Sequence, residues 1–328
     1  MDLVYAAPFR GAALEKLKDF LGGCGIRYDD AITFSVCLCE GDAIAASGSL
    51  DGNVLKCIAV SPARQNEGLT ATVVTELIKE ALRQGRRRLF LFTKPGNRER
   101  FQDLGFYPVS ETGEVLLMEN RKDGVRAFAA QLPRPPGNRI GAIVANCNPF
   151  TRGHLYLIET AAQDCDVLHL FILSEDKSEF PAQARRDLAI RGTAHIPQVV
   201  VQPTGPYLIS AATFPGYFLK DSAAAREANG SLDLKIFAEH FARPLGITRR
   251  FVGSEPYSPL TAAYNLQMGK LLPSYGIKVI EIPRLEAGGG PVSASRVRAL
   301  LKAGDLEAVR DLVPPATYRY LSGRRPPL

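Results

Sequence analysis

The pattern of apolar and polar positions differs between the first and second parts of the chain. In the first part, strand-like runs at residues 33–40 and 43–50 flank a Gly-Asp turn, which favours a β-hairpin. A third strand-like run at 55–61 precedes residues 67–84, where apolar side chains recur at helical spacing until a glycine ends the pattern. With a further apolar run at 88–93, these elements predict an α/β domain with short strands and one long helix.

A proline-rich stretch separates this part from the next. Residues 131–138 (QLPRPPGN) contain three prolines and one glycine, which no regular element accommodates, so we place the domain junction there. Beyond it, strands at 140–145, 167–173 and 199–201 alternate with helices from about residue 153 and over 182–195. This order predicts a parallel sheet with helices on both faces and ligands at the carboxyl ends of its strands. The expected organisation is a first domain over residues 1–125, a linker over 126–138 and a second domain over 139–328.

Charge and composition narrow the class of partner. Forty Lys and Arg residues against thirty-four Asp and Glu residues leave a net charge of +6, which suits small phosphate-bearing anions but lacks the dense basic tracts of a nucleic-acid binder. No apolar run approaches the roughly 18 residues that span a bilayer, and no secretory signal is evident. We therefore expect a soluble, cytoplasmic protein that binds neither nucleic acid nor membrane. Its six cysteines are expected to be buried, reduced thiols, and its four histidines lack metal-ligand spacing, so no dedicated metal site is predicted.

A candidate phosphate site follows the first strand of the second part. The strand at 140–145 continues into the sequence NPFTRGH, which begins at Asn148, includes Phe150 and Thr151, and ends with Gly153 and His154. The glycine allows a tight turn into a helix, whose first N–H groups are unpaired, and a histidine in that first turn is able to donate to a bound phosphate. The alternative is an ordinary turn with a capping threonine and a solvated histidine.

A second basic segment lies near the other end of the chain. The sequence VSASRVR supplies two hydroxyls, at Ser293 and Ser295, and two guanidiniums, one of them at Arg298, at the start of another predicted helix. The alternative is a capped helix with basic surface charge. Together, the two segments resemble the paired motifs of the nucleotidyltransferase superfamily, in which ATP is attacked at its α-phosphate and pyrophosphate leaves.

Further segments of the second part resemble the citrate lyase ligase family. They are SEDKS around Lys177, Arg185, TGPYLIS at 204–210, ATFPGYFLKD at 212–221, and GSEPY, which contains Gly253 and Glu255. The resemblance implies a Rossmann-like adenylating domain and an enzyme that uses ATP and acetate. Its expected product is an acetylated thiol on the prosthetic group of the citrate lyase acyl carrier subunit, formed through acetyl-adenylate with release of AMP and pyrophosphate.

The resemblance also assigns roles to individual residues. His154 is expected at the α-phosphate, Thr151 at the β- or γ-phosphate, and Arg298 at the pyrophosphate. Lys177 and Arg185 are candidates for neutralising the acetate carboxylate or the phosphates, although Arg185 at the surface, paired with Asp187 or Glu179, remains an equal alternative. The other residues expected to bind the nucleotide are Asn148, Phe150, Gly153, Arg185, Gly253, Glu255, Ser293 and Ser295.

Mg²⁺ is the expected companion of ATP. It is expected to be held mostly by phosphate oxygens and water, with Glu255 and Asp176 able to approach it. The other three histidines, His169, His195 and His240, lie in strand or helix patterns and are expected to be packed or at the surface.

The first part resembles the GNAT acetyltransferases, which implies a mixed sheet. Residues 65–70 (QNEGLT), with Gln65 and Gly68, resemble the loop that binds the coenzyme A pyrophosphate, although Thr70 departs from the usual small residue. Phe101 stands where many GNAT members carry a tyrosine that protonates the departing thiolate, and phenylalanine has no proton to donate. Two interpretations stay open: this domain binds the dephospho-coenzyme-A-derived arm of the carrier, or it only packs on the second domain.

Two other functions compete with the ligase. The nucleotidyltransferase motifs are shared with adenylyltransferases that make a dinucleotide or a coenzyme precursor. Phe101 and Thr70 also suit a sensor that binds acyl-CoA or nucleotide without turnover. An acetate requirement for pyrophosphate exchange separates the ligase from the adenylyltransferase, and absence of AMP formation with citrate lyase present would favour the sensor.

Overall fold

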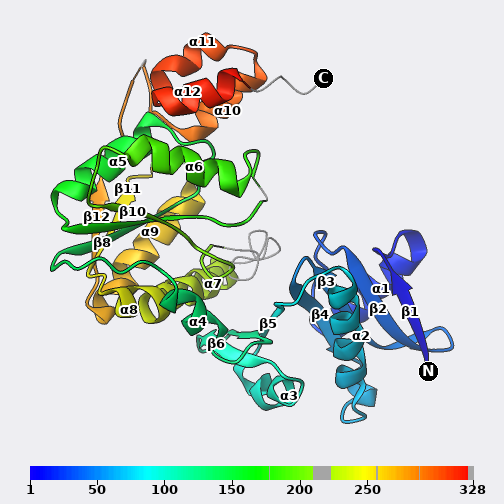
Figure 1. Cartoon of the computed structure of the whole chain (residues 1–328). Coiled ribbons are helices and arrows are strands. Elements are labelled where there is room, and N and C mark those ends of the chain that lie inside the picture. Colours follow the sequence, from blue (N-terminus) through cyan, green and yellow to red (C-terminus); the bar gives the residue numbers. More distant parts are fainter. Residues whose placement is uncertain (177, 210–222, 256–257, 288, 324–328) are drawn as a thin grey trace. The chain divides into compact units, whose positions relative to one another are not determined.

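The computed structural model describes residues 1–328 except 177, 210–222, 256–257, 288 and 324–328 (Figure 1). The chain forms two compact units, the first made of Met1–Gly124 with Ala211–Leu232, and the second of Val125–Ser210 with Asp233–Leu328. Helix α4 (Gly124–Ala130) occupies part of the stretch 126–138 that the sequence suggests as a linker.

The first unit is built on a seven-stranded mixed sheet. Its strand order is β1-β2-β3-β4-β5-β7-β6, and only the β4–β5 pairing among these strands is parallel. The expected mixed sheet is therefore confirmed. The strands are β1 (Asp2–Ala6), β2 (Phe34–Glu40), β3 (Ala43–Asp51), β4 (Val54–Val60), β5 (Phe90–Thr93), β6 (Tyr107–Glu111) and β7 (Leu116–Glu119), and the helices are α1 (Gly11–Gly23), α2 (Leu69–Arg83) and α3 (Arg98–Gln102).

Helix α2 packs tightly on this sheet. Its side chains Val73 and Leu77 are fully buried, and a Cβ atom at Gly48 of β3 would lie 2.4 Å from Cγ1 of Val73. Only a residue without a side chain lets helix and strand approach this closely. Phe101 of α3 belongs to the same core and is 5% exposed.

The second unit is built on a five-stranded parallel sheet, as predicted. The strand order is β10-β9-β8-β11-β12, and every pairing between these strands is parallel, so their carboxyl ends share one edge. The strands are β8 (Ile140–Ala145), β9 (Val167–Ile172), β10 (Val199–Pro203), β11 (Arg249–Gly253) and β12 (Lys278–Ile282). The helices that follow β8 along the chain are α5 (Arg152–Gln163), α6 (Ala182–Thr193), α7 (Ala223–Ile236) continued by a π-helical turn (Phe237–Ala242), α8 (Arg243–Leu245), α9 (Pro259–Leu271), α10 (Ala294–Lys302), α11 (Leu306–Val309) and α12 (Pro315–Ser322). Of these, α7 is divided at Leu232 between the two units.

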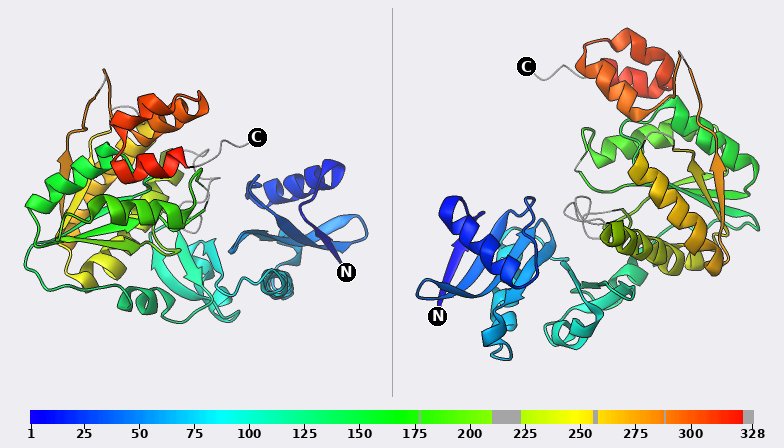
Figure 2. Two further views of the ribbon diagram at one scale, coloured as in Figure 1. Left: turned by 45° about the horizontal axis from the view of Figure 1, so that its top comes forward. Right: turned by 180° about the vertical axis from the view of Figure 1, so that it is seen from behind.

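Helices α5 and α6 cover one face of the parallel sheet through a common core that includes Ile158, Leu170 and Leu188. Helices α10, α11 and α12 form a group beside them in both views (Figures 1 and 2). Phe180, in the loop before α6, is buried among side chains of this group, including Val297 of α10. This packing places α10 near the beginning of α6.

Among the described residues, no helix has both the length and the apolar character needed to cross a membrane. All six cysteines are free thiols, but only Cys37, Cys147 and Cys165 are buried as expected, whereas Cys24, Cys39 and Cys57 are half-buried.

Candidate nucleotide-binding site

The NPFTRGH segment forms the turn from β8 into α5, and its threonine and histidine hold each other. Thr151 is the N-cap residue, and its Oγ1 accepts the backbone N–H of His154 at 3.3 Å. In return, Nδ1 of His154 accepts the backbone N–H of Thr151 at 3.0 Å. This reciprocal cap satisfies two N–H groups at the helix start and fixes the imidazole there.

The cap also fixes the tautomer of His154. A backbone N–H only donates, so Nδ1 is an acceptor and the ring proton lies on Nε2. Burial, with a contribution from the charge of Arg284, lowers the pKa of His154 to about 4, so the ring is neutral at pH 7. Phe150 is fully buried and stacks on the imidazole with ring centroids 5.8 Å apart. The result is an oriented, neutral Nε2–H donor at a helix N-terminus.

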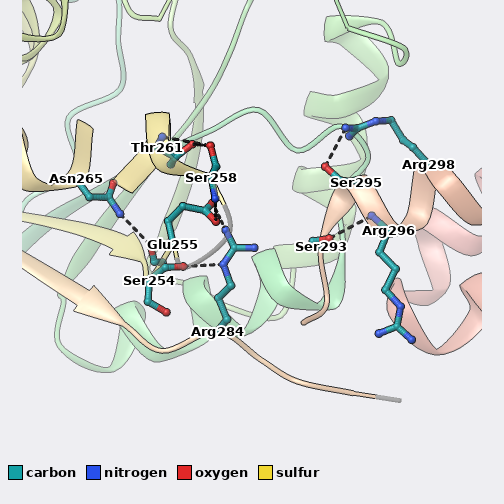
Figure 3. Close-up of polar contacts among 11 residues, drawn as sticks. Ser254, Glu255, Ser258, Thr261, Asn265, Arg284, Ser293, Ser295, Arg296 and Arg298 are labelled. Carbon is teal, nitrogen blue, oxygen red and sulfur yellow. Dashed lines mark hydrogen bonds and ion pairs between the residues drawn. The ribbon is translucent and has the colours of Figure 1, made fainter. Parts of the chain in front are cut away.

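Two contacts join this turn to the VSASRVR segment at the start of α10. A Cβ atom at Gly153 would lie 2.4 Å from the carbonyl oxygen of Val292, so the two backbones touch. Nη1 of Arg298 donates to the carbonyl oxygen of Asn148 at 2.5 Å, and Nη2 donates to Oγ of Ser295 at 3.1 Å (Figure 3). The structure thus brings together the two motifs that lie about 140 residues apart in the sequence.

Ser293 is the N-cap residue of α10. Its Oγ accepts the backbone N–H of Arg296 at 3.2 Å and caps α10 (Figure 3). The Arg296 guanidinium donates to the carbonyl oxygen of Ala287 at 2.7 Å, so it holds the loop before α10.

Arg185 is buried, not at the surface. It has no exposed area, and its donors reach the carbonyl oxygens of Phe180 and Asn146, both at 3.0 Å, and of Glu175. Burial lowers the pKa of this guanidinium, yet the hydrogen bonds satisfy it. Arg185 therefore holds the loop between β9 and α6, and it makes no pair with Asp187 or Glu179. Lys177, in that loop, lies outside the described residues.

The carboxyl end of β11 contributes a second polar cluster. Asn265 donates to the carbonyl oxygen of Gly253 at 3.1 Å, and Oε1 of Glu255 accepts the backbone N–H of Ser258 at 3.1 Å (Figure 3). Oε2 of Glu255 pairs with Arg284, whose Nε donates to the carbonyl oxygen of Ser254 at 2.6 Å.

The sequence analysis did not single out Arg284. The position of Arg284 could have identified it, because Arg284 lies two residues after β12, at the sheet edge where ligands bind.

The carboxylates expected to approach Mg²⁺ are already engaged. Glu255 pairs with Arg284, and Asp176 accepts the backbone N–H of Ala182 at the start of α6. Within the part of the chain that the structure describes, no group of three His, Cys, Asp or Glu side chains is arranged to hold a metal ion. These residues do not fit a dedicated protein site for Mg²⁺.

In the first unit, Gly68 is the residue before α2 and has a φ of 74°, in the left-handed region. A Cβ atom there would meet nothing within 4 Å, so the loop that contains Gln65 and Gly68 faces open space. Of the other histidines, His169 is 1% exposed, while His195 is at the surface and pairs with Glu159 at 3.0 Å. His240 is half-buried.

Comparison with known proteins identifies the family. Residues 140–321 match the model of the citrate lyase ligase C-terminal domain. The chain belongs to the citrate lyase ligase family. It is 47% identical to the [citrate [pro-3S]-lyase] ligase of Klebsiella pneumoniae over 85% of this chain and 83% of that protein. It is 41% identical to the protein of the same name in Escherichia coli K12, over 94% of this chain and 90% of that protein.

A solved structure of Thermotoga maritima TmcAL with bound α-thio ATP aligns with 56% of this chain and 55% of its own, at 15% identity and a TM-score of 0.41. The family membership of this chain rests on the sequence matches, which span both units.

Proposed function

We propose that this ligase-family protein activates acetate with ATP and transfers the acetyl group to the thiol of the prosthetic group on the citrate lyase acyl carrier subunit. The observation that carries the proposal is the neutral, oriented Nε2–H of His154 at the start of α5, beside the segment that holds Arg298. Such donors stabilise charge as it grows on a phosphate, because they need no reorganisation during the reaction.

The first half-reaction requires an attack on phosphorus. An acetate oxygen forms a bond to the α-phosphorus of ATP, and the bond from that phosphorus to the bridging oxygen of the β-phosphate breaks, so pyrophosphate leaves with the electron pair. His154 donates to the α-phosphate oxygens, while Thr151 and Arg298 face the leaving phosphates. Mg²⁺, when bound with ATP, would help to neutralise the phosphate charge, and the described residues provide no dedicated protein site for it.

The second half-reaction consumes the acetyl-adenylate. The thiolate of the prosthetic arm attacks the acetyl carbon, the bond from that carbon to the phosphate oxygen breaks, and AMP leaves; the thiol proton passes to solvent. Adenylation is needed because acetate itself would have to expel an oxide, whereas AMP is a stable leaving group.

We propose that the first unit binds the prosthetic arm. Its Gln65–Gly68 loop opens α2 and faces open space, as an anion-binding loop at a helix start requires. Phe101 is in the core of the unit, which argues against acetyl transfer by this unit alone.

The decisive experiment is isotope exchange between ATP and radiolabelled pyrophosphate, with and without acetate. The proposal requires exchange that depends on acetate and needs no citrate lyase, followed by AMP release when deacetylated citrate lyase is added. Exchange without acetate would mean that the adenylyl group passes to an acceptor other than acetate. Absence of both exchange and AMP would contradict the proposal and would leave either a binding protein without turnover or an adenylyltransferase whose acceptor is missing from the assay.

A further inference from the structure

Three neighbouring strands of the parallel sheet, β8, β11 and β12, end at the same edge. The chain after β8 leads to His154, the chain after β11 to Glu255, and the chain after β12 to Arg284. Parallel pairing therefore places Arg284, which belongs to neither of the two motifs, at the edge where the nucleotide is proposed to bind.

Arg284 is held from one side only. Its Nε donates to the carbonyl oxygen of Ser254 at 2.6 Å, and its Nη2 pairs with Oε2 of Glu255. The Glu255 side chain is 9% exposed, whereas that of Arg284 is 28% exposed. Within the described part of the chain, Nη1 of Arg284 has no hydrogen-bond partner, and Figure 3 shows this nitrogen on the side of the guanidinium that points away from Glu255.

This arrangement differs from those of two other arginines near the site. Arg185 and Arg296 direct their guanidiniums at backbone carbonyl oxygens and thereby hold loops. Arg284 is instead oriented by a nearly buried carboxylate and keeps one N–H-bearing nitrogen for another acceptor. A guanidinium fixed in this way presents a donor to phosphate with little loss of side-chain entropy.

We infer that Arg284 binds a phosphate group of the nucleotide through Nη1, and that Glu255 is the positioning residue that aims it, with no contact of its own to nucleotide or metal. The inference rests on the proposed function in so far as the nucleotide is ATP. The inference is also supported by the positive charge of Arg284, which contributes to the lowered pKa of the His154 ring. Because His154 is proposed to act at the α-phosphate and its strand ends at the same sheet edge, we expect the α-phosphate to be the partner of Arg284.

The first test is direct binding of AMP and of α,β-methylene-ATP, measured by calorimetry. Arg284→Gln removes one charge-assisted hydrogen bond, so we expect both ligands to bind roughly 10- to 100-fold more weakly. Lys278→Gln is the matched control, because it removes the same charge from the other end of β12, and it is expected to leave both affinities within about twofold. Unchanged AMP and analogue affinities in a folded Arg284→Gln variant would overturn the inference.

The second test separates positioning from contact. If Glu255 acts through Arg284, Glu255→Gln weakens AMP binding, and the double variant is no weaker than Arg284→Gln alone. Effects of the two substitutions that add in full would show that Glu255 contacts the nucleotide independently, and would overturn its positioning role.

The third test measures the pKa of His154 in the absence of any substrate. The NMR titration of the His154 ring should show a higher pKa in Arg284→Gln and a nearly unchanged pKa in Arg284→Lys, since lysine keeps the charge. An unchanged pKa in Arg284→Gln would show that the guanidinium does not face His154. If the parent protein lacks acetate-dependent exchange yet loses AMP affinity on Arg284→Gln, the proposed function fails and the inference about Arg284 stands.

Discussion

A Cβ atom on Gly153 would lie 2.4 Å from the carbonyl oxygen of Val292, a distance at which one backbone has to move. Gly153 is in the first turn of α5, and Val292 directly precedes the cap of α10. The NPFTRGH motif thus needs a glycine at position 153 because of the VSASRVR motif. Since glycine has no side chain, the starts of α5 and α10 can meet. This contact places the two motifs in one site.

Gly153→Ala tests this contact. We expect the substitution to separate the starts of α5 and α10 and to lower acetate-dependent exchange roughly tenfold or more, since small displacements of positioned groups are costly in catalysis. Gly269→Ala in α9 is the control: its Cβ meets nothing within 4 Å, and alanine should stabilise the helix by about 0.5–1 kcal/mol. Wild-type exchange by a well-folded Gly153→Ala variant would show that the close approach has no catalytic importance.

His154→Ala tests the proposed transition-state donor. Loss of one preorganised donor costs about a hundredfold or more in rate, so we expect acetate-dependent AMP formation to fall by that factor while ATP affinity changes little. The exposed His195→Ala, whose ring pairs only with Glu159 at the surface, serves as the comparison. A nearly normal rate in a folded His154→Ala variant would remove His154 from the mechanism.

Arg298→Ala is expected to weaken the binding of pyrophosphate and ATP more than that of AMP. A guanidinium at the leaving phosphates contributes roughly 1.5–3 kcal/mol through charge-assisted hydrogen bonds, in the ground state as well as the transition state. Calorimetry with the three ligands measures the difference, and Arg310→Ala, at an exposed arginine paired with Glu307, is the control. Equal loss for AMP and pyrophosphate would contradict the assignment of Arg298 to the leaving group.

The stability of the second unit should depend on pH through His169. Burial lowers the pKa of this histidine to about 4 in the folded chain, whereas an unfolded histidine titrates near pH 6.5. Between these values the unfolded chain binds the extra proton, so stability falls as the pH drops through this window and is unaffected by His169 above it. His169 alone contributes a largest slope of about 1.4 kcal/mol per pH unit, and His154, whose pKa is lowered to a similar value, contributes in the same direction.

Native-state hydrogen exchange of β9 amides at pH 5 to 7 measures this dependence. His169→Gln should be less stable overall yet show a flatter pH dependence, whereas the exposed His195→Gln should follow the parent. A parallel loss of stability in the parent and in His169→Gln would assign the pH effect to other groups.

The elements that the sequence predicted well are those with continuous apolar runs between turn signals. The run at 140–145 is β8 with the same bounds, and the run at 43–50 is β3 within one residue. Strands β1, β6, β7, β11 and β12 had no predicted range. In β1 and β12, exposed or half-exposed side chains interrupt the apolar pattern, whereas the interior strands β7 and β11 are only four and five residues long. Edge strands are half-solvated, so their sequences carry less of the periodic signal.

The candidate site was predictable where its chemistry is local and not where it depends on distant pairing. The capping threonine belonged to the alternative interpretation of this turn, and the structure shows that Thr151 does cap α5, with the ring of His154 held in the same cap. The pairing of Glu255 with Arg284 depends on the adjacency of β11 and β12, which the sequence did not show. Arg185 was expected at phosphates or at the surface, because a sequence shows a charge and not the carbonyl oxygens that surround it.

Gly68→Val tests the first unit, through the loop proposed to bind the prosthetic arm. A valine at φ of 74° is strained, and its side chain would project into the open space that the arm is proposed to enter. We expect a raised apparent KM for the citrate lyase substrate, whereas acetate-dependent pyrophosphate exchange, which needs the second unit only, stays close to normal. The strain itself should destabilise the first unit by about 1–3 kcal/mol.

Gly85→Val is the matched control for this loop. Gly85 follows the other end of α2, has a φ of 75° and also faces open space, so valine there carries the same strain without obstructing the loop. The two variants should therefore unfold alike, and only Gly68→Val should impair the second half-reaction, with acetyl-adenylate formed but poorly used. Equal activity of both variants towards citrate lyase would leave the first unit with a packing role. Loss of both half-reactions in Gly68→Val alone would instead mean that the Gln65–Gly68 loop takes part in adenylation, since the strain is common to both variants.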